Sequence, residues 1–508
     1  MNKPNKNECD SEEAENLQIQ KSTMTNIPNL KGDWLNFYLL LLFYILQGFP
    51  VGLSGSLPII LQSRKMVTYK EQALFSIVVW PYAVKVLFAP LVDSLYSKRI
   101  GRRKSWMMPI QFLIGMILMY TANNIDDWLP ESGKSNLTMI ACVMFAINVL
   151  TAIQDVVVDG WSLTILKKNN VGYASMCNST GLPIGMFIGS VGPILLVSED
   201  FSNKYFRAIP NTGGLITLKS FMYFWSIIFL LITTLIGLFK KEKDNSFELD
   251  YKKISIFQNY KLLWNILKKP KIKLLLIALL TARFGFSATD AASNFKLIDA
   301  GLSNDDIMLT VTGMYVVRFI VPFFIPKSII GPKCIDHYLI MTPIKLIWCI
   351  TYMVLIYYTP SLINNNKNIN IPVYYYCLLA SIFAVNEVLH FFMLVALFAF
   401  FSRISDPRFG CTYMALFNTF YFLGWFIPNT LVLKLNDFLT FSTCSNDIQN
   451  NCLTPNLKNV CATNGGSCKV YVDGYYITVI ICVIIGLIWY FLFRNKLKNY
   501  QPIRVNTS

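Results

Sequence analysis

The sequence predicts an all-α polytopic membrane protein with twelve transmembrane helices in two six-helix halves. Three observations predict this fold class. The chain is 54% hydrophobic and 15% charged, whereas an average soluble domain is about 25% charged. Its apolar residues gather in runs long enough for a transmembrane helix, which needs about 20 residues. Its net charge of +16 is divided among short runs between the apolar stretches, as in topology-setting loops, so we expect no nucleic-acid partner.

Each apolar run marks one expected span. The spans are 35–57, 72–95, 105–123, 137–166, 172–197, 219–239, 273–298, 305–326, 336–359, 371–402, 409–434 and 474–494. They predict the following organisation: a cytosolic disordered tail at 1–34, an N-terminal six-helix bundle at 35–239, a cytosolic linker at 240–272, a C-terminal six-helix bundle at 273–494 with a Cys-rich loop at 435–472, and a cytosolic tail at 495–508. Two six-helix halves joined by a basic loop are typical of the major facilitator superfamily.

Lys and Arg are concentrated in the loops that face inward if the N-terminus is inside, notably at 98–104 and 240–273. This bias predicts that both termini are cytosolic. Within the linker, residues 254–267 carry apolar side chains at near-helical spacing, followed by Lys268 and Lys269. We expect an amphipathic helix on the inner membrane surface, with a soluble linker helix as the alternative.

Four cysteines lie in the 435–472 loop, on the opposite side of the predicted membrane. They are Cys444, Cys452, Cys461 and Cys468. An even number of cysteines in a non-cytosolic loop predicts two disulfides, and three pairings are possible. The loop has neither a CxxC pair nor a His, so we expect no metal there, and no motif elsewhere predicts a cofactor.

The connection between the second and third spans carries a charge pattern typical of facilitator proteins. Asp93 ends one span, and Gly101 with Arg102 and Arg103 precedes the next. A carboxylate and arginines at a helix junction can form a gating latch that closes one side of a transporter and opens when its halves rock. The alternative is a basic loop that only sets topology.

Ionisable residues inside spans are costly and therefore mark functional candidates. Those expected to bind the solute, or to pair with groups that bind it, are Lys85, Asp155, Asp159, Arg283, Asp290, Arg318, Glu387 and His390. Trp161, like Trp80 and Tyr82, offers a flat face for a ring. Lys296 and Lys345 lie nearer to the ends of their spans, where they are expected to reach the interface. The alternative is that these charges pair and only hold the bundle together. Because the chain has no GxxxxGK[ST] phosphate loop, transport would be driven by a solute gradient.

Eight longer stretches closely resemble the acetyl-coenzyme A transporter family of the endoplasmic reticulum membrane. They are LQGFPVGLSGSLPIILQS (46–63), WPYAVKVLFAPLVDSLY (80–96), GRRKSW (101–106), QDVVVDGW (154–161), NVGYASMCNSTG (170–181), GFSATDAA (285–292), SDPRFGCTYMALFNT (405–419) and GGSCKVYVDGYY (465–476). The QDxxxD pattern also resembles bacterial muropeptide permeases, whereas the four-cysteine loop resembles only the eukaryotic transporter.

The resemblance implies a protein that is not an enzyme and that imports cytosolic acetyl-CoA into the endoplasmic reticulum lumen for acetylation. Its partners would be acetyl-CoA and the lipid bilayer, and a homodimer is possible. One alternative is a permease for another anionic metabolite. A second is a membrane-bound acetyltransferase, with Glu387 and His390 as the catalytic pair. A third is a non-transporting receptor or scaffold.

Overall fold

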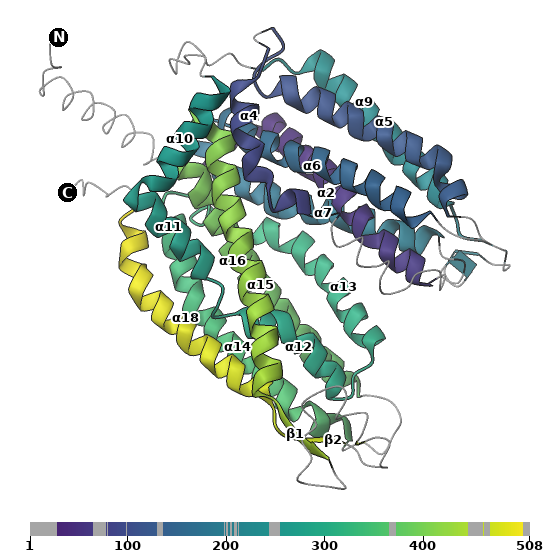
Figure 1. The fold of residues 1–508 in the computed structure, drawn as a ribbon, viewed down its shortest axis with the longest axis vertical. Helices are drawn as coiled ribbons and strands as arrows, with labels where there is room; N and C mark the ends of the chain where they lie inside the picture. Colours follow the sequence, from purple (N-terminus) through teal and green to yellow (C-terminus); the bar gives the residue numbers. More distant parts are fainter. Residues whose placement is uncertain are drawn as a thin grey trace, which may run out of the picture. The chain divides into compact units, whose positions relative to one another are not determined.

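A computed structural model describes most of the chain (Figure 1). The described residues are 28–63, 78, 80–97, 99–129, 136–197, 199, 202–203, 206–207, 211, 213–242, 255–364, 372–444, 461 and 468–500. Within them, nine helices are long and apolar enough to cross a membrane. These are α2 (Trp34–Ser63), α5 (Lys104–Trp128), α6 (Leu137–Ile165), α7 (Tyr173–Val197), α9 (Leu218–Phe239), α14 (Cys334–Asn364), α15 (Val373–Ile404), α16 (Gly410–Leu439) and α18 (Gly474–Lys498).

The expected span at 72–95 is not one continuous helix. Its residues 72–77 and 79 lie outside the described part of the chain. The remainder forms three short elements: η1 (Trp80–Tyr82), η2 (Lys85–Leu87) and α4 (Ala89–Ser94). Proline lacks an N–H and clashes with the preceding turn, and Pro81 and Pro90 stand in η1 and at the start of α4. The prediction of a regular helix here was therefore wrong.

Two further expected spans are also interrupted. The 273–298 span divides into α11 (Pro270–Thr281) and α12 (Ser287–Asp299), with turns at 282–286 between them. Gly285 lies in that break, and a Cβ there would be only 2.9 Å from the Cα of Gly486 in α18. The 305–326 span forms α13 (Asn304–Ile320) followed by η4 (Val321–Phe324), because Pro322 cannot continue the helix.

The chain divides into two compact units, and each is described by itself. Unit 1 comprises 1–269, 324–334 and 394–419, and unit 2 comprises 270–323, 335–393 and 420–508. In unit 1, α2 packs along α7 and α5 along α9. Glycines allow the backbones of α2 and α7 to touch: a Cβ on Gly185 would lie 2.0 Å from the carbonyl oxygen of Ile45. Small residues that allow such close approach are the usual basis of helix packing in membranes.

Residues 256–268 of the linker form helix α10 (Ile256–Lys268), which begins with a capping box between Ser255 and Gln258. α10 lies against α4 in unit 1. The Asn259 amide donates to Ser94 Oγ at 2.5 Å, and the Tyr260 hydroxyl donates to the carbonyl oxygen of Leu87 at 2.6 Å. α10 is therefore bound to the short helix that carries Asp93.

In unit 2, α12 and α11 pack against α18. The indole N–H of Trp489 in α18 donates to the carbonyl oxygen of Ala278 in α11 at 3.1 Å. Strands β1 (Phe441–Cys444) and β2 (Cys468–Val472) pair antiparallel in the loop between α16 and α18. A disulfide joins Cys444 to Cys461, whereas Cys452 lies outside the described residues. One of the two predicted disulfides is therefore present in the described part of this loop.

Candidate solute-binding and gating sites

Lys85 lies at the start of η2 and is only 2% exposed. Its ammonium group forms an ion pair with Asp155 Oδ2 in α6. The other carboxylate oxygen of Asp155 accepts a hydrogen bond of 2.5 Å from the Gln47 amide in α2. The cation that the sequence singled out in the second span is thus paired with a carboxylate from the QDVVVD stretch.

Asp159 lies one turn beyond Asp155 on α6 and has a different environment. Its Oδ1 accepts from the Tyr44 hydroxyl at 2.8 Å and from the Asn178 amide at 3.4 Å. Its Oδ2 accepts from the Asn418 amide of α16 at 2.6 Å. Within the described residues, its partners are neutral donors rather than a cation. The two carboxylates of this motif therefore differ in chemistry: one neutralises a charge, and the other joins α6 to three further helices.

Trp161 is 2% exposed, and its indole stacks on Phe43 with ring centroids 5.2 Å apart. Because a face of the ring is already covered, we assign Trp161 to packing in this structure. Trp80, in contrast, is 65% exposed.

A second charge cluster surrounds Arg283, which lies in the break between α11 and α12 of unit 2. Its guanidinium donates to Asp290 Oδ2 at 2.9 Å and to the Tyr421 hydroxyl at 2.7 Å. Lys345 Nζ lies 3.9 Å from the other oxygen of Asp290. Lys345 is only 2% exposed, so the expectation that it reaches the membrane interface was wrong. The distance of Lys345 from the end of its predicted span did not indicate that it lies in this cluster.

A third pair joins Arg318 of α13 to Glu387 of α15. The guanidinium makes two hydrogen bonds to the carboxylate, of 2.7 and 3.0 Å, and lies 5.1 Å from the ring centroid of Tyr315. This bidentate geometry is the strong form of an arginine–carboxylate contact. Glu387 is thus committed to Arg318, and the described contacts include no hydrogen bond between Glu387 and His390.

Lys296 has the partners expected near a helix end. Its ammonium lies 2.9 Å from Asp473 and 3.3 Å from Asp299. Asp473 also caps the start of α18 by accepting from the backbone N–H of Tyr475. We therefore assign Lys296 a structural role at the junction of α12 and α18.

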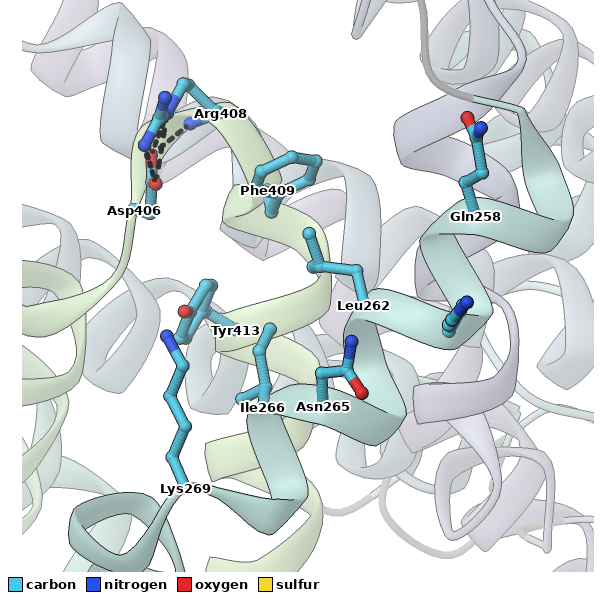
Figure 2. A pocket seen from close by; sticks show the side chains of 10 residues that line it. Gln258, Leu262, Asn265, Ile266, Lys269, Asp406, Arg408, Phe409 and Tyr413 are labelled. Carbon is cyan, nitrogen blue, oxygen red and sulfur yellow. Dashed lines mark hydrogen bonds and ion pairs between the residues drawn. The ribbon is translucent and has the colours of Figure 1, made fainter. Parts of the chain in front are cut away.

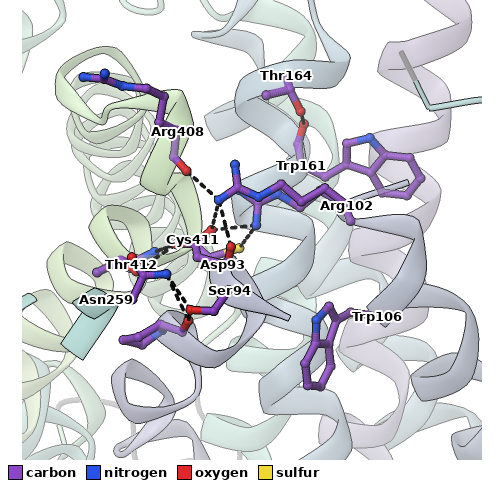
Figure 3. Close-up of polar contacts among 12 residues, drawn as sticks. Asp93, Ser94, Arg102, Trp106, Trp161, Thr164, Asn259, Arg408, Cys411 and Thr412 are labelled. Atoms are coloured by element: carbon purple, nitrogen blue, oxygen red, sulfur yellow. Dashed lines mark hydrogen bonds and ion pairs between the residues drawn. The ribbon is translucent and has the colours of Figure 1, made fainter. Parts of the chain in front are cut away.

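The three residues of the predicted gating latch meet in unit 1 (Figure 3). Asp93 Oδ1 accepts from Arg103 at 2.7 Å and from Arg102 at 3.3 Å. Its Oδ2 accepts from the backbone N–H and the hydroxyl of Thr412 at 2.9 and 2.8 Å. A single buried carboxylate therefore links the α4–α5 connection to the start of α16.

Further contacts support the same junction. Arg102 donates to the carbonyl oxygen of Arg408 at 2.6 Å (Figure 3). Arg103 lies 2.7 Å from Cys411 Sγ. Gly160 of α6 allows the approach, because a Cβ there would lie 2.3 Å from the same sulfur. Glu242 accepts from the backbone N–H groups of Arg103 and Lys104 at 3.0 Å. This carboxylate satisfies free donors at the start of α5.

The partners that complete these clusters were not identified from the sequence. They are Tyr44, Gln47, Asn178, Lys345, Thr412, Asn418 and Tyr421. Their shared signal is a hydrogen-bonding side chain within an apolar run. Gln47 and Asn418 carry it most clearly, because an amide inside a membrane requires a partner.

The fold is that of known facilitators. The structure matches the outward-conformation structure of the transporter FucP with a TM-score of 0.51 and 13% identity, over 90% of this chain and 98% of that one. It matches the proton:xylose symporter XylE with a TM-score of 0.53 and 12% identity, over 91% and 94% of the two chains.

Relatives are also found by sequence. An uncharacterised protein of Schizosaccharomyces pombe is 30% identical over 89% of this chain and 84% of its own length. An uncharacterised membrane protein of Saccharomyces cerevisiae is 29% identical over 94% and 97%. A putative transporter named AmpG 1 of Rickettsia bellii is 26% identical over 30% of this chain and 37% of its own.

A family model described as "Acetyl-coenzyme A transporter 1" matches residues 36–254, 244–334 and 333–507, which together span nearly all of the sequence. With the facilitator fold and the membrane-spanning helices, this match identifies a multi-pass membrane transporter. The chain belongs to the acetyl-coenzyme A transporter 1 family.

Proposed function

We propose that this protein carries cytosolic acetyl-CoA across the endoplasmic reticulum membrane into the lumen by alternating access. The observation that carries the proposal is a set of three ion pairs at predicted membrane depth: Lys85–Asp155, Arg283–Asp290 and Arg318–Glu387. Charges in such positions are expensive and mark solute pathways. The family match supports acetyl-CoA as the solute.

The chemistry of the three cations fits a phosphorylated solute. Coenzyme A derivatives carry several phosphate charges, about −4 in total at neutral pH. Guanidinium and ammonium groups bind phosphate oxygens, and arginine binds them with two parallel hydrogen bonds. Within each unit, an arriving phosphate would compete with the paired carboxylate for the cation: with Asp155 in unit 1, and with Asp290 and Glu387 in unit 2. When the solute is absent, the carboxylates would leave no buried cation uncompensated.

The gating latch of Asp93, Arg102 and Arg103 gives the proposal a switch. Its contacts with Thr412 and Arg408 would have to break and re-form in each cycle, because alternating access changes the contacts between elements of the two sequence halves. With both termini in the cytosol, as the basic loops predict, the latch lies on the cytosolic side.

A permease for another anionic metabolite is the second candidate. The partial match to AmpG-named proteins and the QDVVVD stretch at 154–159 favour it over an enzyme. The same three cations would serve any solute with several negative charges, so only the solute itself separates the two candidates.

Counterflow in proteoliposomes tests the choice. Vesicles loaded with unlabelled acetyl-CoA should take up external labelled acetyl-CoA, and coenzyme A should compete better than acetate. Absence of counterflow with folded protein, or equal competition by unrelated dianions, would refute acetyl-CoA as the solute. Transfer of label to an added acceptor by purified protein would instead support the enzyme.

A further inference from the structure

A cavity whose lining includes no residue of the three ion pairs lies in unit 1, between α10 and the segment 406–413. It has a volume of about 470 Å³, within the roughly 300–1,000 Å³ of small-molecule sites. One wall is α10 and the other is the loop that ends in the first turn of α16 (Figure 2). The distribution of Lys and Arg among the predicted loops indicates that both walls of the cavity are on the cytosolic side.

The charge of the cavity favours an anion. Lys261 and Lys269 line it, together with Arg408 and Asp406. The Asp406 carboxylate is already paired with Arg408. It accepts hydrogen bonds from the Arg408 guanidinium at 2.9 and 3.1 Å and from the Arg408 backbone N–H at 2.9 Å. Within the described residues, the ammonium groups of Lys261 and Lys269 have no carboxylate partner. Lys261 of α10 and Lys269, the residue that caps its C-terminus, thus line the cavity without a carboxylate partner among the described residues.

The remaining lining favours a ring. Phe409 and Tyr413 project from the 406–413 wall, and Leu262 and Ile266 from α10 (Figure 2). The Asn265 amide, a hydrogen-bond donor and acceptor, lies beside them. Aromatic and aliphatic surfaces with one amide match a heterocyclic base, for which stacking on aromatic side chains is the general mode of binding.

We propose that this cavity binds a nucleoside diphosphate, with its phosphates on Lys261 and Lys269 and its base against Phe409 and Tyr413. None of the residues that line the cavity belongs to the proposed solute site, and the proposal does not depend on which solute is carried.

Binding there has a consequence for the gating latch. α10 is hydrogen-bonded to Ser94, the neighbour of Asp93, through Asn259. The opposite wall is joined to the gating latch through the carbonyl oxygen of Arg408 and through Thr412. A ligand that touches both walls adds a second connection between the same two parts of unit 1, so it favours the state in which the gating latch is closed.

Titration calorimetry of ADP against the purified full-length protein tests the site. The test variant carries Lys261→Gln and Lys269→Gln together, and the matched control is Lys268→Gln, on the same helix but outside the cavity lining. We expect the double variant to raise the Kd for ADP at least tenfold and the control to leave it within twofold. Pyrophosphate, which has no base, should bind at least tenfold more weakly than ADP.

Hydrogen exchange gives an independent measurement. ADP should slow amide exchange in 256–268 and 406–413 in the original protein and in Lys268→Gln, but not in the double variant. An unchanged Kd in the double variant, absence of ADP binding at millimolar concentration, or equal binding of pyrophosphate would overturn the proposal. Loss of ADP binding in Arg283→Gln with Lys261 and Lys269 intact would also overturn it, because ADP would then occupy the proposed solute site. None of these outcomes decides whether acetyl-CoA is transported.

Discussion

Asp93 and Thr412 are 319 residues apart in the sequence, yet the Asp93 carboxylate accepts both the backbone N–H and the hydroxyl of Thr412, at 2.9 and 2.8 Å. The same carboxylate binds Arg103 through its other oxygen. Asp93 is the point at which a charge from the first half of the sequence is joined to a helix from the second half. Its replacement is therefore the most direct test of the gating latch.

We expect Asp93→Asn to change the maximal transport rate several-fold while changing the KM for acetyl-CoA less than twofold. The neutral amide keeps the shape but loses charge-assisted bonds of about 1.5–3 kcal/mol each. Uptake kinetics in proteoliposomes measure both quantities. A folded Asp93→Asn protein with an unchanged rate would show that the cluster only sets topology. Asp126→Asn, which removes an exposed ion pair with Lys219, is the matched control and should have no effect.

Arg283 and Asp290 allow a solute-binding role to be separated from a structural one. Arg283→Gln should weaken acetyl-CoA binding at least tenfold, because a cation that contacts phosphate is lost. Asp290→Asn should lower thermal stability, since Arg283 and Lys345 both lose their carboxylate and uncompensated buried charge is costly.

The double variant Arg283→Gln with Asp290→Asn decides between the two roles. We expect it to regain thermal stability without regaining affinity. If it folds and binds acetyl-CoA at the original strength, Arg283 is structural and its assignment to the solute site is wrong. Binding titrations and melting curves on the same preparations give both readouts.

Gly185→Val should abolish the folded protein or destabilise it by more than the roughly 1–3 kcal/mol of ordinary overpacking. The added Cβ would meet the carbonyl oxygen of Ile45 at 2.0 Å, and a backbone atom cannot turn aside as a side chain can. Gly55→Ala in α2 is the control, because nothing lies within 4 Å of its Cβ. Size-exclusion profiles and melting temperatures should separate the two, and similar behaviour would contradict the close α2–α7 packing.

Peptide mapping without reduction should recover Cys444 linked to Cys461, as the structure has them. Closing a loop of this length stabilises a fold by roughly 3 kcal/mol, so reduction should lower the melting temperature. The free thiols of Cys142 and Cys377 serve as the control and should react with a membrane-permeant alkylating reagent before reduction. Alkylation of Cys444 in native membranes under the same conditions would disprove the bond.

Asp33 predicts a pH dependence at the start of α2. Burial alone would raise the pKa of its carboxyl, but hydrogen bonds from the Lys167 backbone, Asn170 and Asn36 outweigh burial and hold the pKa below its usual value. The stabilisation is therefore fully present above the unfolded pKa, about 3.9, and is lost as the pH falls through the lower folded value. Between pH 6 and pH 3 the melting temperature should fall more steeply for the original protein than for Asp33→Asn, and parallel curves would exclude this role.

The sequence predicted the helical membrane fold well, because an apolar run of about 20 residues is rarely anything other than a transmembrane helix. It also singled out Lys85, Asp155, Arg283 and Arg318 as charges within apolar runs, and the structure places each of them in an ion pair. Their role in solute binding stays a prediction. Continuity was harder to predict. At the break before α12, Gly285 lies close to Gly486, a contact between distant segments that hydropathy does not record.

The neutral members of the clusters were missed for a related reason. In the sequence, Asn418 is one of the polar residues of the second half. In the structure its amide lies 2.6 Å from the Asp159 carboxylate. Lys345 was misjudged because distance from a span end is a poor guide in α14, a helix of 31 residues. Pairing partners follow from tertiary packing, which a single sequence does not contain.

The direct contact of α2 with α7 constrains how this protein can move. A carbonyl oxygen lies close to where a Cβ would stand at both Gly48 and Gly185. Sliding of one helix along the other would bring side chains against this backbone, so we expect α2 and α7 to move together. The two helices would then act as one rigid body within unit 1. Gln47 belongs to α2 and Asn178 to α7, whereas the carboxylates that they bind, Asp155 and Asp159, belong to α6. A movement of α2 and α7 along α6 would therefore change the hydrogen bonds of Asp155 and Asp159 at the same time.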